Sequence, residues 1–234
     1  MYILGIETST KTGSVAVVSD KAVIAQYSLN IEITHSERLM STVDRVLKDT
    51  GIALSQLDGF AVATGPGSFT GLRIGVSTVK GLAFATDKPA AAVPTLYALA
   101  WNVPHAAHPV CPLLDARKNE VYAAVYTSDG PVLSQTVPEA VVPLSRLGDL
   151  VAGRAVFTGE AAILYRGEIE RMFGEKALFA PHSAILPAAA AVAEIGLGMI
   201  RAGRQADIDS LAPKYIRRPE AEVAWERMQS RETS

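Results

Sequence analysis

The chain has 234 residues, of which 49% are hydrophobic and 20% are charged, and its formal net charge at pH 7 is -2. This length and balance predict a globular protein with one large domain or two smaller ones. The small net charge excludes a protein that grips nucleic acid over its whole surface, although it leaves room for a local basic patch.

Targeting signals are not expected. The N-terminal residues contain no basic region followed by a long apolar run, as a secretory signal would. No stretch of about 18 apolar residues occurs without a break, which argues against a membrane-spanning helix. Cys111 is the one cysteine, so no disulfide can form within the chain. We expect a cytoplasmic protein in which Cys111 is a small buried residue.

The first half of the chain predicts strands and helices in alternation. The opening run YILGIE is typical of a buried strand, and two β-rich runs on either side of Asp20 and Lys21 indicate a hairpin. A helix is expected from about Thr34 to Gly51, because Thr34 and Glu37 have the spacing of a capping box. Beyond it, the chain continues with the strand GFAVAT, a glycine loop, a second helix to about residue 85, the strand AAAVP and the helix TLYALAWN.

The order of elements then restarts. The segment VCPLLDARKNEVYAAVYTSDGPVLSQTV repeats the events of YILGIETSTKTGSVAVVSDKAVIAQYSL: strand, acidic residue, polar turn, strand, turn and strand. The repeat favours an internal duplication, although two unrelated strand meanders would also produce it. The helices AAILYRGEIERMFG and PAAAAVAEIGLGMI then alternate with the strands RAVFTG and ALFAP, as in a two-domain α/β protein. We expect the domain join at residues 102–109.

The glycine loop GPGSFTG fails two tests for phosphate binding. A P-loop needs a lysine in the first helical turn, but the first lysine here is Lys80. A dinucleotide fingerprint needs a third glycine where Thr70 stands. A tight turn with an N-cap at Ser68 or Thr70 is the favoured interpretation. Because a helix N-terminus attracts anions, the candidate phosphate-binding residues are Gly65, Gly67, Ser68 and Thr70.

The helix after this loop contains Gly71, Gly75 and Gly81. Each glycine costs about 1 kcal/mol relative to alanine in an exposed helix interior. Gly71 and Gly75 share one helical face, with Thr78 and Val79 next along it. A helix with such glycines allows another backbone to approach. That backbone could be its own sheet or a partner's helix, and we expect some of each.

Two further groups of polar residues are candidates for chemistry. His105 and His108 have H-x-x-H spacing, but they lie beside prolines without an acidic third ligand, so we interpret them as solvent-exposed. The charged segment DARKNEVY reads as a solvated turn, and its chemical role stays open. No catalytic residue is predicted.

The segment GPGSFTGLRIGVSTVKGLAFA closely resembles the signature of the TsaB family (formerly YeaZ), subunits of the bacterial machinery that makes threonylcarbamoyladenosine in tRNA. The segments ILGIETST, HSERL, DARKNEVYAAVY and PKYIR match the family in the same order, over residues 3–217. The resemblance implies the α/β fold of actin, sugar kinases and heat-shock ATPases, with two duplicated ribonuclease-H-like domains. These would span residues 1–103 and 104–218, followed by a flexible tail at 219–234.

The resemblance also implies a function. The chain would be a non-catalytic scaffold and activator for threonylcarbamoyl transfer to the adenosine next to the anticodon, in tRNAs that read codons beginning with A. It would dimerise with the sister subunit TsaD and support the ATPase subunit TsaE. It would contact tRNA through this complex, although the basic cluster KYIRR could also touch phosphate.

No cofactor or metal is expected on this chain alone, while the partner subunits use ATP and metal. The H-x-x-x-H motif of TsaD would fall on Thr95 and Leu99, neither of which is a suitable ligand. Glu7 stands where many relatives have an aspartate, which helps to hold magnesium in ATP-using members of the superfold. The alternatives are an independent ATP-dependent kinase and a peptidase M22-like metallopeptidase. The missing phosphate lysine and metal pair disfavour both.

The resemblance finally implies a helical-bundle interface with TsaD through helices at about 36–50 and 70–85. The same apolar strip would be exposed in the isolated chain, which leaves a weaker homodimer and a monomer both open. The candidate interface residues are Leu39, Met40, Val43, Leu47, Gly71, Gly75, Thr78 and Val79.

Overall fold

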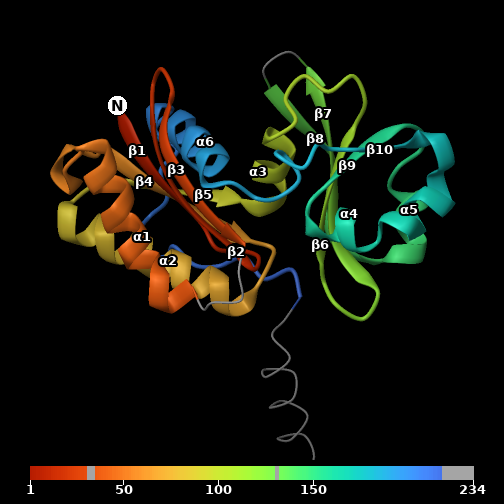
Figure 1. Cartoon of the computed structure of the whole chain (residues 1–234), viewed down its shortest axis with the longest axis horizontal. Helices are drawn as coiled ribbons and strands as arrows, with labels where there is room; N and C mark the ends of the chain where they lie inside the picture. Colours follow the sequence, from red (N-terminus) through yellow and green to blue (C-terminus); the bar gives the residue numbers. More distant parts are fainter. Residues whose placement is uncertain (31–34, 130–131, 218–234) are drawn as a thin grey trace, which may run out of the picture.

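The structure is a computed structural model, and it describes residues 1–30, 35–129 and 132–217. Two five-stranded sheets lie side by side, with helices on their faces (Figure 1). The expected tail at 219–234 and Thr34 of the expected capping box lie outside the described residues. None of the described helices combines the length and apolar character needed to span a bilayer.

The first sheet has the strand order β3-β2-β1-β4-β5. β1 pairs antiparallel with β2 and parallel with β4, and β4 pairs parallel with β5. Both faces of β1 and β4 are buried, as expected for strands that helices cover from two sides. The strands are β1 (Tyr2–Glu7), β2 (Thr12–Ser19), β3 (Val23–Asn30), β4 (Gly59–Gly65) and β5 (Ala90–Pro94).

Helices α1 (His35–Thr50) and α2 (Phe69–Thr86) cover one face of this sheet, and α6 (Ala189–Arg201) covers the other (Figure 1). Leu4 and Ile6 of β1 pack under α1 and α2, whereas Ile3 packs toward α6. This division follows from the alternation of side chains along a strand. Gly5 lets α6 approach closely, because a Cβ there would lie 2.7 Å from the Cβ of Ala193.

The second sheet has the order β10-β9-β6-β7-β8 and repeats the pairing of the first. β6 pairs antiparallel with β7 and parallel with β9, as β1 does with β2 and β4. The duplication predicted from the sequence is therefore confirmed. The strands are β6 (Val110–Asp115), β7 (Glu120–Asp129), β8 (Val132–Pro143), β9 (Ala155–Thr158) and β10 (Ala177–Phe179).

The remaining helices connect and cover the second sheet. The expected helix AAILYRGEIERMFG is interrupted at Tyr165, which gives α4 (Glu160–Leu164) and α5 (Arg166–Phe173). Helix α3 (Thr95–Trp101) lies between the sheets, where Leu96 and Leu99 join an apolar cluster with β6 and β7. Among the described residues, three short 3-10 helices complete the fold: η1 (Leu54–Gln56), η2 (Leu144–Asp149) and η3 (Gly174–Lys176).

The chain returns to the first sheet after it has completed the second. By sequence, α6 falls within the range 104–218 expected for a C-terminal domain, but it packs on β1, β2 and β4. We call the first sheet with α1, α2 and α6 the first unit, and the second sheet with α4 and α5 the second unit. The chain thus crosses between the units twice.

Candidate functional site

The glycine loop is shaped to contact other segments of its own chain. Gly65 and Gly67 have φ values of +119° and +153°, which other residues rarely adopt. A Cβ on Gly67 would collide with the carbonyl oxygen of Ser9, and a Cβ on Gly65 would lie 2.6 Å from the carbonyl oxygen of Lys214. The two glycines therefore admit the turn after β1 on one side and the C-terminal segment on the other.

Backbone donors of this loop bond to the chain itself. The amide of Ser68 donates to the carbonyl of Ser9 (2.6 Å), and the amide of Gly65 donates to the hydroxyl oxygen of Thr95 (3.1 Å). Ser68 is the N-cap of α2, and its hydroxyl oxygen accepts from the amide of Gly71 (3.3 Å). Thr70, in the first turn, is exposed. These contacts favour the tight strand-to-helix turn over a phosphate cradle at Gly65, Gly67, Ser68 and Thr70.

Acidic side chains gather beside this loop, at the ends of the central strands of both sheets. Glu7 ends β1 and is fully buried, with Oε1 accepting from the amide of Ser9 at 2.5 Å. Burial raises the pKa of Glu7 to about 7, the nearby Glu160 adds to the rise, and the hydrogen bond from the amide of Ser9 opposes it. Among the described residues, Oε2 of Glu7 and the hydroxyl of Ser9 have no hydrogen-bond partner.

Asp115 ends β6, at the position that corresponds to Glu7 in the repeat. Its Oδ1 accepts from the amide of Arg117 (2.9 Å) and from the hydroxyl of Tyr165 (3.2 Å). Burial and the charge of Asp115 raise the pKa of Glu160. Within residues 1–30, 35–129 and 132–217, no three histidine, cysteine or acidic side chains are arranged to hold a metal ion.

The positions that would carry the histidines of the sister subunit lie in the interior. Thr95 and Leu99 are both fully buried, Thr95 against Gly65 and Leu99 in the apolar cluster between the sheets. Cys111 is also fully buried, and burial raises the pKa of its thiol to about 12. Cys111 is thus the small core residue predicted from the sequence.

The structure corrects the expectation that Gly71 and Gly75 open α2 to a partner's helix. A Cβ on Gly75 would collide with the hydroxyl of Thr8 and lie 3.4 Å from the side chain of Val62. The hydroxyl of Thr8 in turn donates to the carbonyl of Gly71 (2.7 Å). Gly75 therefore admits the turn after β1 and the first sheet, and Gly71 is buried on the same side of α2.

Other candidate interface residues also pack inward. Leu39, Val43 and Val79 are buried in the core of the first unit. Leu47 and Thr78 are half-buried, and Met40 is 53% exposed. Of the eight candidates, Met40 is thus the large apolar side chain that faces solvent. The physical reason is that the inward faces of α1 and α2 both cover the sheet.

The outward face of α2 presents a different set of residues, which the sequence reasoning missed. Phe84 is 87% exposed, and a Cβ on Gly81 would meet no atom within 4 Å. Exposed residues recur along this face at the spacing of a helix, and this pattern in the sequence could have identified the face. We define the outer strip of α2 as Thr70, Arg73, Ser77, Gly81 and Phe84. Helix α1 packs beside α2 (Figure 1).

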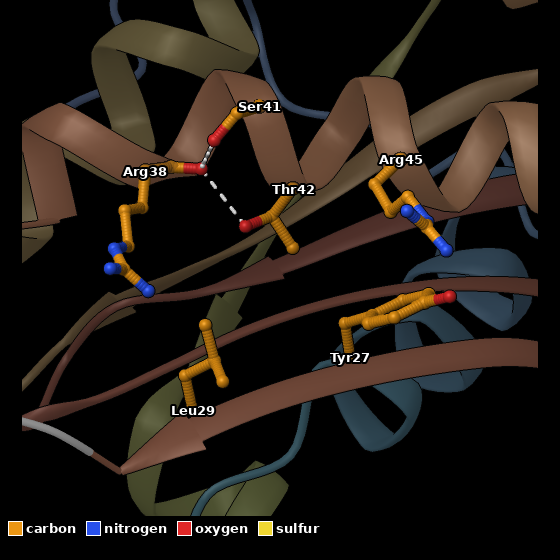
Figure 2. A pocket seen from close by; sticks show the side chains of 6 residues that line it. All are labelled: Tyr27, Leu29, Arg38, Ser41, Thr42 and Arg45. Carbon is orange, nitrogen blue, oxygen red and sulfur yellow. Dashed lines mark hydrogen bonds between the residues drawn. The ribbon is translucent and has the colours of Figure 1, made fainter.

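A groove between β3 and α1 is a further candidate site (Figure 2). Its polar groups bond to one another: the hydroxyls of Ser41 and Thr42 both donate to the carbonyl of Arg38, at 2.8 and 2.9 Å. Arg45 pairs with Asp49 at 2.6 Å, and the hydroxyl of Tyr27 also bonds to Asp49. These local bonds do not converge on a ligand. The groove is lined by Tyr27, Leu29, Arg38, Ser41, Thr42 and Arg45.

The sequence of the chain matches a family model and a curated protein over most of its length. The family model described as TsaD, tRNA N6-adenosine threonylcarbamoyltransferase, matches residues 24–225. The chain is 34% identical to the tRNA threonylcarbamoyladenosine biosynthesis protein TsaB of Bacillus subtilis (strain 168), over 96% of this chain and 98% of that protein.

Solved structures give the same result. YeaZ from Pseudomonas aeruginosa superimposes with a TM-score of 0.77 and 30% identity, over 92% of this chain and 99% of that one. Component A of the (R)-2-hydroxyglutaryl-CoA dehydratase of Acidaminococcus fermentans shares the fold, with a TM-score of 0.52 at 12% identity over 86% of this chain and 99% of that one. The α/β fold of two duplicated halves predicted from the sequence is confirmed, and the chain belongs to the TsaB (YeaZ) family.

Proposed function

We propose that this chain takes part in threonylcarbamoyladenosine modification of tRNA, as a non-catalytic subunit that pairs with TsaD and supports TsaE. The observation that carries the proposal is the 34% identity to a protein named for this pathway, over nearly the full length of both chains. In this proposal the chain works in the cytoplasm, binds no cofactor or metal alone and meets tRNA within the complex. The partner subunits use the ATP and the metal.

The outer strip of α2 is the surface that we assign to TsaD. An aromatic side chain that is 87% exposed, as Phe84 is, contributes little to the stability of an isolated chain. Its burial against a partner would contribute roughly 1.5–3 kcal/mol. Gly81 leaves open space on the same face, and the exposed Met40 on α1 extends the apolar area. In the absence of TsaD, a second copy of this chain would use the same surface more weakly.

The contacts around the glycine loop support a non-catalytic role over the kinase alternative. The turn after β1, which directly follows Glu7, is packed against the loop, and the amide of Ser68 donates to that turn. The buried Thr95 and Leu99 likewise support a scaffold over the metallopeptidase alternative.

Reconstitution tests the proposed function. The purified chain is mixed with TsaD, TsaE and tRNA, and modified adenosine is measured with each protein omitted in turn. We expect the product to disappear when this chain is left out. Full modification without it would refute the proposed function.

Substitution of Phe84 tests the surface separately. Phe84→Ala should weaken binding to TsaD roughly 10- to 100-fold in calorimetry, the equivalent of one buried aromatic side chain. Leu164→Ala on α4 is a matched control, because Leu164 is also an exposed apolar side chain (61%) but lies in the second unit. Unchanged affinity of Phe84→Ala would show that TsaD binds elsewhere.

A further inference from the structure

The C-terminal segment is held tightly by the first unit before it reaches the second. The amide of Ala206 donates to the carbonyl of Ala90 (2.7 Å), and Nζ of Lys80 donates to the carbonyl of Asp209 (2.9 Å). Leu211 is buried in the core of the first unit. The amide of Lys214 then donates to the carbonyl of Thr64, at the end of β4 (2.7 Å).

Tyr215 continues this attachment on α2. Its ring lies 4.9 Å from the ring of Phe69, measured between centroids. Nε of Arg73 donates to the hydroxyl oxygen of Tyr215 (3.0 Å), while the guanidinium carbon lies 3.8 Å from the centroid of Phe69. Such stacking of a cation and two rings fixes Tyr215 at the first turns of α2.

The neighbouring side chains reach across to the second unit. Nζ of Lys214 lies 2.8 Å from a carboxylate oxygen of Glu139 on β8, and the side chain of Glu139 is only 5% exposed. Nη1 of Arg217 donates to the carbonyl of Ala116 (2.8 Å), and its other terminal nitrogen pairs with Glu120. Lys214, Tyr215 and Arg217, which lie within four residues of one another, therefore connect both units.

The turn at residues 117–119, which Arg217 contacts at both ends, is itself strained. Arg117, Lys118 and Asn119 follow one another with φ values of 62°, 56° and 58°. This left-handed region costs roughly 1–2 kcal/mol for a residue such as Arg117 or Lys118, whereas asparagine enters it more readily. Arg217 bonds to Ala116 just before these residues and to Glu120 just after them. Both ends of the strained turn are thus tied to the first unit through the C-terminal segment.

Another set of contacts between the units lies around α3. Leu96, Leu99 and Ala100 pack against the second sheet, and Nδ2 of Asn102 donates to the carbonyl of Leu186 (3.0 Å) where the chain crosses back. Figure 1 shows the dark blue end of the chain passing from beside α2 toward the second sheet, away from α3. The C-terminal segment is therefore a second, separate attachment between the units.

We propose that residues 211–217 form a strap that locks the two units in one relative arrangement, with Arg73 as its anchor on α2. Without the strap, the units would be free to hinge about the apolar cluster at α3. Arg73 also belongs to the outer strip of α2, so a partner bound to that strip would contact the residue that anchors the strap. That consequence rests on the proposed function, whereas the lock concerns the isolated chain.

Distance measurements between the units test the strap. Spin labels are attached at Lys21→Cys in the first unit and Glu175→Cys in the second, both of which are exposed, while the buried Cys111 stays unlabelled. Double electron–electron resonance is recorded on labelled chain diluted in an excess of unlabelled chain. We expect one narrow distance distribution for the parent chain, and a second population at longer distance for Arg217→Ala and for Arg73→Ala.

Arg171→Ala is the matched control, because Arg171 also forms a surface ion pair, with Glu168, but stays within α5. Circular dichroism verifies that each variant is folded. A parent-like distribution in the double variant Lys214→Ala, Arg217→Ala would overturn the strap, and so would equal broadening in Arg171→Ala. A parent-like distribution in Arg73→Ala alone would overturn its assignment as the anchor. None of these results depends on TsaD.

Discussion

The two sheets place an acidic residue at the same point, the end of the central strand, yet the two residues have different surroundings. Glu7 is fully buried, and its pKa is raised to about 7 by that burial. Asp115 is half-buried and accepts bonds from Arg117 and Tyr165. The duplicated backbone therefore positions the acid, while the segment that covers it decides its chemistry.

The covering segments differ between the units. In the first unit, the glycine loop and the long helix α2 pack on the turn after β1 through Gly67 and Gly75. In the second unit, a single residue, Gly159 with φ +98°, separates β9 from the short helix α4. The turn after β6 is instead held by Arg217. One turn is stabilised by packing, and the other by polar bonds from the strap.

Placing a large side chain against the turn after β1 should have the largest effect on the free energy of unfolding. Gly75→Leu places a side chain where the hydroxyl of Thr8 already lies, so we expect a loss of roughly 3 kcal/mol in the free energy of unfolding. Gly81→Ala is the control on the same helix: it faces open space and should stabilise the chain by about 0.5–1 kcal/mol. Denaturant unfolding followed by circular dichroism measures both. Equal stability of Gly75→Leu and the parent chain would contradict the packing of α2 on β1.

Neutralising Glu7 should have a large effect that depends on pH. The unfolded chain loses this proton near 4.5 and the folded chain near 7. The stabilising contribution is therefore complete below about pH 4.5 and is lost as the pH rises through about 7. Glu7→Gln does not titrate, so at pH 8 it should be up to about 3 kcal/mol more stable than the parent chain. If the free energy of unfolding changes between pH 5 and pH 8 by the same amount in both proteins, the buried carboxyl of Glu7 with a raised pKa is contradicted.

Removing the acid of the second turn should have a smaller effect. Asp115→Ala takes an acceptor from the amide of Arg117 and from the hydroxyl of Tyr165, which we expect to cost about 1–2 kcal/mol. Tyr165→Phe removes one of the two bonds and should cost less. The order of the two unfolding free energies is the test, and a larger loss for Tyr165→Phe would contradict it.

Relieving the strained turn should have the smallest effect, and in the opposite direction. Lys118→Gly replaces a residue at φ 56° by one that adopts this region freely, so we expect a gain of about 1 kcal/mol. Lys118→Val, which is β-branched, should destabilise the chain instead. Thermal unfolding distinguishes the two variants. Equal melting temperatures would show that the left-handed turn stores no strain at Lys118.

Local patterns determined much of this protein. The repeat of strand, acid, turn, strand and strand identified the duplication, because buried strands must be apolar whatever packs on them. The missing lysine and third glycine identified GPGSFTG as a turn, and Ser68 does cap α2. The long motif GPGSFTGLRIGVSTVKGLAFA, with the other matching segments in the same order, also sufficed to recognise the family. These features depend on neighbours along the chain, so the sequence alone expresses them.

Only the tertiary structure decided which faces of the helices and sheets pack together. Glycines in a helix permit close approach by a sheet or by a partner, and the spacing of Gly71 and Gly75 is the same in both cases. A Cβ on Gly75 would meet Thr8 of the turn after β1 and Val62 of β4, so the chain's own first unit approaches here. The return of α6 to the first sheet and the reach of Arg217 to Glu120 join residues far apart in sequence. Such contacts follow from three-dimensional packing, which hydrophobic periodicity along one segment does not encode.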